Sequence, residues 1–384
     1  MFLLHIFISF NLSFSPWITT GSPDTVFCQV FPRLYEYDGN IYLLAGVYYR
    51  DKGGLIVIKN SKKMWSIDIN SSVYYGFTMA DSLIFVGDYS GTIYIYTLSG
   101  DLVKKIKAEK EIKDIKKSEN YLFIFEGNCS TFEVLDLKSL EIVRKKKTST
   151  MLGSMGYDVY NGRVYMTSSK GSNILTCYDV KKDTFLWSAD LGLKMGAMFW
   201  ILPGPNFITY MNATEEGIFV GTIFGDIFEI AENGKILKKG SAGKGRIIRS
   251  IQPIPIDENR EGLLVGTYEG TLILLDRKDM KVLWRYKMVE ESADPPLILK
   301  INDKWKVLSV DKARNLYLIN IHGESEWKGR IEGDEFEESP YLIAGDIDRD
   351  GYLDLILKGS TCGRLYLSKT NILVGKGRII KDEK

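Results

Sequence analysis

Histidine and glutamine are nearly absent from this sequence, which has only two of each among its 384 residues. His5 lies in an apolar run at the N-terminus and His322 in a polar turn, so a Ser-His-Asp or Cys-His catalytic site would depend on His322. Neither G-x-S-x-G nor G-x-x-x-x-G-K-[ST] occurs. The sequence therefore disfavours a serine or cysteine hydrolase and a P-loop nucleotide-binding protein.

The chain also lacks an excess of charge of either sign. It has 50 basic and 49 acidic residues, which gives a formal net charge of +1. Because a nucleic-acid binder usually carries an overall basic footprint, we expect no nucleic-acid partner. The local basic runs within 104–117 and 144–147 are typical of exposed outer strands, with a polyanion-binding patch as the alternative. Abundant Lys and Glu give a thermophile-like composition, although the plentiful asparagines argue against it.

The four cysteines show no C-x-x-C spacing, which leaves zinc binding and thioredoxin-type chemistry without support. Two interpretations stay open. In an exported protein, Cys28 could pair with Cys362 and Cys129 with Cys177; otherwise all four are small buried hydrophobic residues.

No hydrophobic run is long enough to cross a membrane comfortably, and we expect no transmembrane span. The run at 1–14, MFLLHIFISFNLSF, has the length of the hydrophobic region of a signal peptide. We therefore expect residues 1–22 to be a signal peptide or N-terminal apolar segment, and residues 23–384 to form one exported or cell-surface domain. The run has no Lys or Arg and no A-x-A cleavage site, so alternatives stay open. The run could be a strand, or the start codon could be wrongly assigned, and the protein would then be cytoplasmic.

The dominant feature of the sequence is an internal repeat. Residues 263–284, LLVGTYEGTLILLDRKDMKVLW, predict a strand, a tight turn, a second strand, a polar turn and a third strand. The pattern recurs at 41–65, 83–106, 121–143, 163–187, 217–240, 306–327 and 353–374. Each copy follows a segment that supplies one more strand, which makes four strands in about 40 to 50 residues. Since helical periodicity and βαβ alternation are missing, we predict an all-β fold, a single β-propeller of about eight four-stranded blades, with seven as the alternative.

The repeat resembles that of the quinoprotein-like propellers with PQQ-type repeats. Gly266, Gly270, Asp276 and Trp284 match that repeat best, and three further tryptophans take the equivalent strand end: Trp65, Trp187 and Trp327. The second, third and fifth copies lack this tryptophan. The resemblance implies that Trp packs between neighbouring blades and that Gly shapes the turns.

The same resemblance implies a family in which some members bind PQQ with calcium on the propeller axis. Members that oxidise alcohols carry an adjacent Cys-Cys pair, and this sequence has none. We therefore expect no PQQ and no catalysis of that kind.

One segment departs from the repeat. The sequence DIDRDGYLD at 346–354 places carboxylates at Asp346, Asp348, Asp350 and Asp354, and Tyr352 can add its backbone carbonyl. Alternating carboxylates before a glycine can fold around a hard cation, so calcium is the expected ligand. The flanking segments predict strands, which excludes an EF-hand. The segment is similar to the calcium loops of FG-GAP repeats in integrin-like propellers, and an Asp-rich hairpin turn without metal is the alternative.

A second irregular segment, 191–217, is long and rich in aromatic and methionine residues. It is a candidate partner surface formed by Met198, Phe199, Trp200, Phe207 and Tyr210. The alternative is a first blade strand preceded by a buried hairpin.

These features predict a non-catalytic binding or scaffold propeller with a structural calcium site and a protein or glycan partner. The alternative is a calcium-dependent enzyme with its site on the propeller axis, either quinoprotein-like or acting on polysaccharides. An axial cluster of carboxylates and arginines would favour that alternative.

Overall fold

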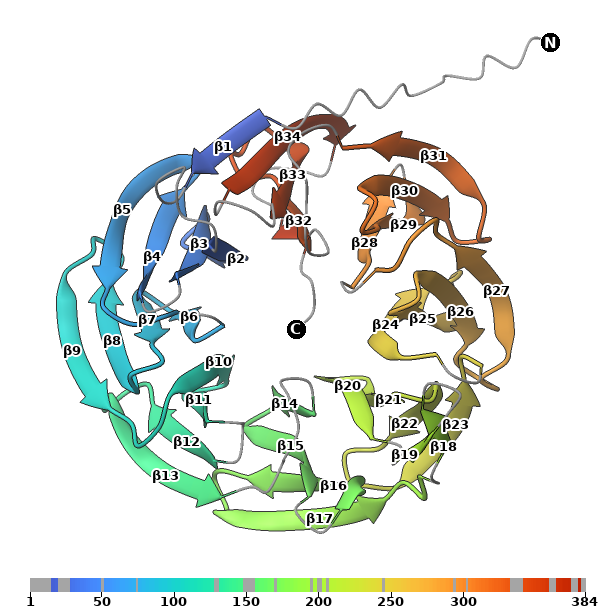
Figure 1. The fold of residues 1–384 in the computed structure, drawn as a ribbon, viewed down its shortest axis with the longest axis horizontal. Helices are drawn as coiled ribbons and strands as arrows, with labels where there is room; N and C mark the ends of the chain where they lie inside the picture. The colour runs from blue at the N-terminus through green and yellow to red at the C-terminus, as the bar shows by residue number, and fades with distance from the viewer. Residues whose placement is uncertain are drawn as a thin grey trace.

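The computed structural model describes residues 15–19, 28–49, 52–73, 75–127, 131–147, 156–168, 171–193, 196–198, 202–204, 207–243, 246–292, 295–301, 303–331, 341–358, 364–373 and 379–380. All regular elements in these ranges are β-strands, and eight sheets of four or five strands form a closed ring around one axis (Figure 1). The predicted eight-bladed propeller is therefore confirmed. Within the same ranges no helix has the length and apolar character needed to span a membrane.

In blades 1 to 7 the strands run outward from the axis in chain order, and blade 1 begins at β2. The innermost strands of blades 1 to 7 are β2 (Cys28–Tyr37), β6 (Phe77–Ala80), β10 (Ile112–Ser118), β14 (Tyr157–Tyr160), β20 (Ile208–Thr214), β24 (Ile248–Pro255) and β28 (Leu297–Ile301), and β32 (Tyr341–Gly345) is their counterpart in blade 8. The second strands are β3 (Asn40–Tyr49), β7 (Leu83–Gly87), β11 (Tyr121–Glu126), β15 (Arg163–Ser168), β21 (Gly217–Thr222), β25 (Glu261–Thr267), β29 (Lys304–Val310) and β33 (Tyr352–Lys358).

The third strands are β4 (Lys52–Lys59), β8 (Thr92–Thr97), β12 (Thr131–Asp136), β16 (Gly171–Asp179), β22 (Asp226–Ile230), β26 (Thr271–Asp276), β30 (Asn315–Asn320) and β34 (Arg364–Leu373). The outer strands of blades 1 to 7 are β5 (Lys62–Ile69), β9 (Leu102–Lys107), β13 (Glu141–Lys147), β17 (Thr184–Asp190), β23 (Ile236–Ser241), β27 (Val282–Lys287) and β31 (Ser325–Arg330).

Burial explains why the strands differ in composition. The second strands are covered on both faces by neighbouring blades and are almost wholly apolar; in β25 every residue after Glu261 is buried. The outer strands alternate exposed and half-buried positions, as in β9 and β27, and several carry lysines. Charged side chains on an exposed edge strand oppose pairing with other chains, so these lysines protect the rim.

The hydrophobic core is divided into layers between adjacent blades. In the layer between blades 5 and 6, Phe219 and Ile227 of one blade pack with Ile251, Val265 and Ile273 of the next, and all five are fully buried. Each such side chain contributes about 1.5–3 kcal/mol relative to an exposed one. The ring therefore depends on every interblade junction, including the one where the chain closes.

Both ends of the described chain join blade 8. The strand β1 (Ser15–Thr19) pairs antiparallel with β34 on the outside, and β35 (Ile379–Ile380) pairs antiparallel with β32 on the inside. Blade 8 thus has five strands in the order β1, β34, β33, β32, β35. Five residues of the segment 1–22 therefore form a blade strand, so the propeller includes residues before position 23.

Candidate functional site

The calcium candidate lies in the loop that joins β32 to β33 in blade 8. Carboxylate oxygens of Asp346, Asp348 and Asp354 lie within 4.8 Å of one another, and Asp346 and Asp354 are almost completely buried. The loop turns through left-handed backbone at Arg349 (φ 65°) and Gly351 (φ 96°), a conformation that glycine adopts without steric cost. The sequence therefore folds here as a tight turn that gathers three carboxylates.

Hydrogen bonds within the loop hold these carboxylates in place. The N–H of Ile347 donates to Oδ2 of Asp354 at 2.9 Å, and the N–H of Asp350 donates to Oδ1 of Asp348 at 3.2 Å. Oδ1 of Asp350 accepts the N–H of Tyr352 at 2.8 Å. Asp350, also expected as a ligand, lies outside the group of three carboxylates, and its side chain is exposed. Tyr352, expected to contribute its backbone carbonyl, begins β33 directly after the loop.

The electrostatics of the loop reflect crowded negative charge. Burial raises the pKa of the Asp354 carboxyl to about 6; the Ile347 N–H opposes this shift and the charge of Asp348 adds to it. Lys369, opposite Asp354 in the register of β33 and β34, forms an ion pair with Asp348 and lies 3.5 Å from Oδ2 of Asp350. Its hydrogen bond to Asp348 raises the pKa of Lys369 above its ordinary value. Lys369 is thus a cation held by the chain itself beside the carboxylates.

The geometry suits a hard cation. Oxygens that bind one calcium ion at about 2.3–2.6 Å lie no more than about 5 Å apart, and calcium takes six to eight oxygens in flexible geometry. The three gathered carboxylates meet this distance criterion, and backbone carbonyls and water can complete such a sphere. Sequence analysis missed Lys369, because its partner depends on the pairing of β33 with β34 rather than on spacing along the chain.

The innermost strands carry a second group of charges, which sequence analysis did not find. Arg33 of β2 forms an ion pair with Asp114 of β10 at 3.1 Å and donates to the carbonyl of Phe77 at 2.7 Å. Asp114 also accepts a hydrogen bond from the hydroxyl of Tyr157 at 3.1 Å. A chain of polar contacts thus links blades 1 to 4 near the axis.

A second axial ion pair extends this chain of contacts. Lys116 lies 2.6 Å from Asp158, and the other carboxylate oxygen of Asp158 accepts the N–H of Ala213 at 2.8 Å. The axial carboxylates Asp114 and Asp158 are therefore each paired with a cation and bonded to a neighbouring blade.

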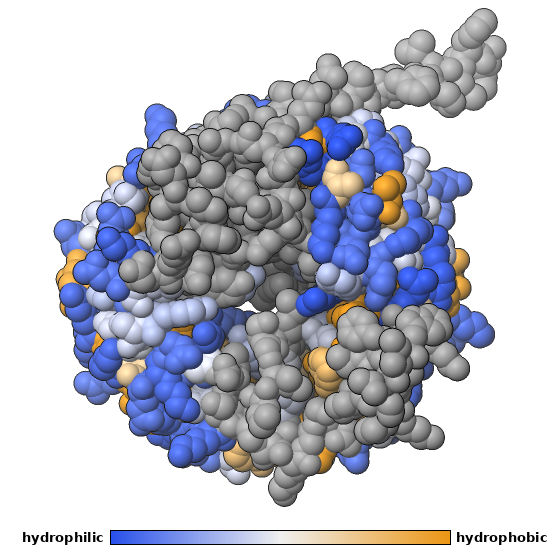
Figure 2. Space-filling view, viewed as in Figure 1, coloured by the Kyte–Doolittle hydropathy of each residue, from blue (hydrophilic) through white to orange (hydrophobic). Residues whose placement is uncertain are grey.

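In Figure 2, hydrophilic residues cover most of the described surface of the face shown, and hydrophobic residues occupy isolated positions.

The tryptophans of the repeat connect adjacent blades, as the resemblance implies. The indole Nε1 of Trp284 in β27 donates to the carbonyl of Ile321 in blade 7 at 2.8 Å. A Cβ at Gly323 in that turn would lie 2.7 Å from the indole, so the ring stacks on a bare glycine backbone. The same pairing of indole and glycine is made by Trp65 with Gly100 and by Trp187 with Gly234.

Long cations replace the tryptophan where the repeat lacks it. Lys104, Arg144 and Lys238 take the same position in strand register, immediately after the outer-strand bulge. The Nζ of Lys104 donates to the carbonyl of Leu140 at 2.8 Å, and Arg144 lies 3.3 Å from Asp183; both partners belong to the turn of the next blade. Tryptophan thus meets a glycine in the next blade at three junctions, and Lys104 and Arg144 meet Leu140 and Asp183 at two others. The degenerate repeats therefore still connect the blades.

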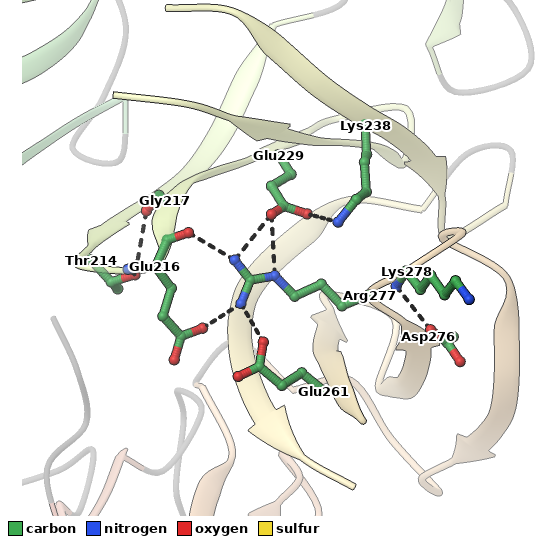
Figure 3. A network of polar contacts seen from close by, with 9 residues as sticks. All are labelled: Thr214, Glu216, Gly217, Glu229, Lys238, Glu261, Asp276, Arg277 and Lys278. Atoms are coloured by element: carbon green, nitrogen blue, oxygen red, sulfur yellow. Dashed lines mark hydrogen bonds and ion pairs between the residues drawn. The ribbon is translucent and has the colours of Figure 1, made fainter. Parts of the chain in front are cut away.

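The junction between blades 5 and 6 is the most elaborate of these replacements (Figure 3). Arg277, in the turn after β26, lies 3.0 Å from Glu229 and 2.7 Å from both Glu216 and Glu261, while Lys238 lies 2.9 Å from Glu229. Burial acts to lower the pKa of Arg277, but its hydrogen bonds and the three carboxylates raise it overall. The network contains three acids and two bases and contacts both blades, so we interpret it as structural.

The aromatic segment 191–217 differs from the partner surface that we considered. Its described part forms a hairpin of β18 (Gly196–Met198) and β19 (Leu202–Gly204), followed by β20. Tyr210 has an exposed fraction of only 3% and packs in the core layer between blades 5 and 6, so placing it on a surface was wrong. Phe207 is half-buried, and Met198 lies in β18. Phe199 and Trp200 lie outside the described residues.

One cysteine is described with its side chain. Cys177 in β16 is a free, buried thiol, and burial raises its pKa to about 12. This fits a small hydrophobic core residue, and Cys129, its expected partner in a disulfide, lies outside the described residues. The side chains of the other three cysteines lie outside the described part.

Comparison with known proteins supports the fold. No protein-family model and no curated protein matches the sequence. Among solved structures, the chain is similar to the computationally designed Ika8 protein, at 13% identity and a TM-score of 0.64, with 92% of this chain and 99% of that chain covered. It is also similar to BamB from Moraxella catarrhalis, at 11% identity and a TM-score of 0.61, with 93% and 99% covered. The C-terminal WD40 domain of Sif2 gives 11% identity and a TM-score of 0.63, with 93% and 98% covered.

Proposed function

We propose that this chain is a non-catalytic binding or scaffold propeller, exported or at the cell surface, whose last blade is stabilised by calcium. Its partner is a protein or a glycan. The observation that carries the calcium part is the gathering of Asp346, Asp348 and Asp354 within 4.8 Å. The binding part is supported by the fold, by its likeness to BamB and to the WD40 domain of Sif2, and by the pairing of the described axial charges.

Calcium has a structural role in this proposal because of where the loop lies. The loop joins β32 to β33. On the inner side β32 pairs with β35, and on the outer side β33 pairs with β34, which in turn pairs with β1. A cation bound to Asp346, Asp348 and Asp354 would stiffen the centre of the closing blade. It would also offset the repulsion that the burial of Asp354 beside Asp348 creates.

The enzymatic alternative receives no support from the described residues. The axial carboxylates Asp114 and Asp158 are bonded to Arg33, Lys116 and backbone groups of neighbouring blades. Such bonded groups do not form an open set of ligands for PQQ, so we assign no step to that cofactor. The axial group contains one arginine, Arg33, and one lysine, Lys116, and each is paired with one of the two carboxylates.

Calorimetric titration of the purified full chain with calcium tests this proposal. We expect Asp348→Ala to abolish the binding heat, because it removes a central ligand. Lys369→Met should strengthen binding by about threefold to tenfold, since an exposed ion pair competes with the ion by about 1 kcal/mol. Asp303→Asn serves as the matched control, because its side chain is 98% exposed and distant in sequence from the loop. Equal heats for the wild-type chain and Asp348→Ala would refute the calcium site.

A further inference from the structure

The inner edge of blade 8 differs from the inner edges of the other blades. In blades 1 to 7 the innermost strand pairs with one named strand within the described chain, the second strand of its own blade, and β10 adds a single parallel bridge between Asp114 and Tyr75. In blade 8, β32 pairs with β33 on one side and with β35 on the other, through Ala344 with Ile380 and Gly345 with Ile379. β35 also contacts β2 and β28, the innermost strands of the two flanking blades. An extended strand therefore occupies the axial side of β32.

We propose that this inner edge of β32 is an acceptor site for an extended segment of a partner protein, and that β35 occupies it until the partner displaces it. The inference rests on the proposed binding function and names its site and the chemistry of the partner. Addition of a strand to an exposed sheet edge is a common mode of peptide recognition, in which backbone hydrogen bonds supply affinity and alternate side chains supply specificity.

The length of the pairing supports displacement. β35 forms only two residue pairs with β32, whereas β1 forms four pairs on the outer edge of the same blade. Five residues, 374–378, connect β35 to the end of β34, and two of these are glycines. A short tether gives a local concentration of about a millimolar, so a weak intramolecular strand fills the site without a partner and yields to a tighter one.

The sequence of β35 indicates what the site accepts. The hexapeptide GKGRII occurs twice in the chain, at 243–248 and at 375–380. The first copy ends at Ile248, the first residue of the innermost strand β24, and the second copy ends in β35. Both copies therefore end in isoleucine that lies in a strand near the axis, Ile248 in β24 and Ile380 in β35. We expect the partner segment to share this chemistry: two β-branched apolar residues after a basic residue.

Fluorescence anisotropy with a labelled peptide of residues 374–384, VGKGRIIKDEK, tests the proposal. We expect this peptide to bind a chain that ends at Leu373 about tenfold more tightly than it binds the full chain, whose site is already filled. A full-length variant with Ile379→Pro and Ile380→Pro should behave like the truncated chain, because proline removes the backbone N–H donors of β35. This variant decides the result if the truncated chain fails to fold.

The control peptide has the same composition in scrambled order. Equal binding of the labelled peptide to the full chain and to both variants, or equal binding of the scrambled peptide, would overturn the proposal. A partner whose affinity is unchanged by removal of residues 374–384 would leave the binding function intact and refute only this site. The calcium titration does not involve β35 and therefore fails or succeeds separately.

Discussion

Trp284 and Gly323 belong to different blades, yet each determines what the other position can be. The indole of Trp284 stacks on the backbone of Gly323 and donates to the carbonyl of Ile321 two residues before it, at 2.8 Å. Any side chain at Gly323 would begin 2.7 Å from the ring. Two residues 39 positions apart thus form one structural unit of the ring.

Gly323→Ala should therefore lower the free energy of unfolding by about 2–4 kcal/mol, from the left-handed backbone and from the clash with the indole. Gly192→Ala is the matched control, because Gly192 has φ 61° and no atom within 4 Å of an added Cβ. The control should lose only about 1 kcal/mol. Urea unfolding measures both variants, and equal losses would show that stacking on Trp284 does not restrict the glycine.

Arg277→Met should destabilise the junction between blades 5 and 6 by about 3 kcal/mol, because Glu229 is almost fully buried and loses one of its two cations. Lys281→Met, in the same turn, should change stability by less than about 0.5 kcal/mol, since its side chain is 80% exposed. Urea unfolding of both variants tests the role of the network. A loss at Arg277 no larger than at Lys281 would mean that the network adds nothing to stability.

The stability of the calcium-free protein should depend on Asp354. Its pKa is raised to about 6 in the folded chain, so folding favours the protonated carboxyl. Stability should fall by about 3 kcal/mol as the pH rises from about 4 to about 6, and this group should contribute no further change above that range. In Asp354→Asn this pH-dependent component should be absent, so the stabilities of the two proteins should diverge across this pH range. Parallel pH profiles for both proteins in the presence of a chelator would contradict the assignment.

Ring closure should depend on β1. Removal of residues 1–22 deletes the strand that pairs with β34, whereas removal of residues 1–14 leaves that strand intact. We expect the longer deletion to cost about 2–4 kcal/mol, since several backbone hydrogen bonds of about 1 kcal/mol each are lost. The shorter deletion should leave the unfolding midpoint unchanged. If both deletions have the same effect, β1 does not close the ring.

The sequence predicted the all-β propeller and its blade number because the repeat is local: strand, turn and strand follow one another within each copy. Contacts between blades were predicted only where they involve a distinctive residue type, as with Trp65 and Trp284. Lys104 and Arg144 take the same position, but lysine and arginine are common on outer strands, so their equivalence became visible only from the strand register.

The candidate site shows the same limit. Asp346, Asp348 and Asp354 could be found from their spacing, since the turn that gathers them is contiguous in sequence. Lys369 could not be found in this way, because it meets Asp348 through the pairing of two strands. Tyr210 was misassigned because an apolar aromatic residue in a long segment fits both a surface and a core strand, and only packing distinguishes the two.

Hydrogen exchange of the full chain with and without calcium tests the central claim most directly, because it reports on the closing blade itself. We expect calcium to slow amide exchange across residues 347–358, while the amides of β25 in blade 6 exchange as before. Asp348→Ala should show no such change. The opposite result is equal amide exchange in this loop with and without calcium at concentrations above about 1 mM. That result would contradict a calcium-stabilised last blade.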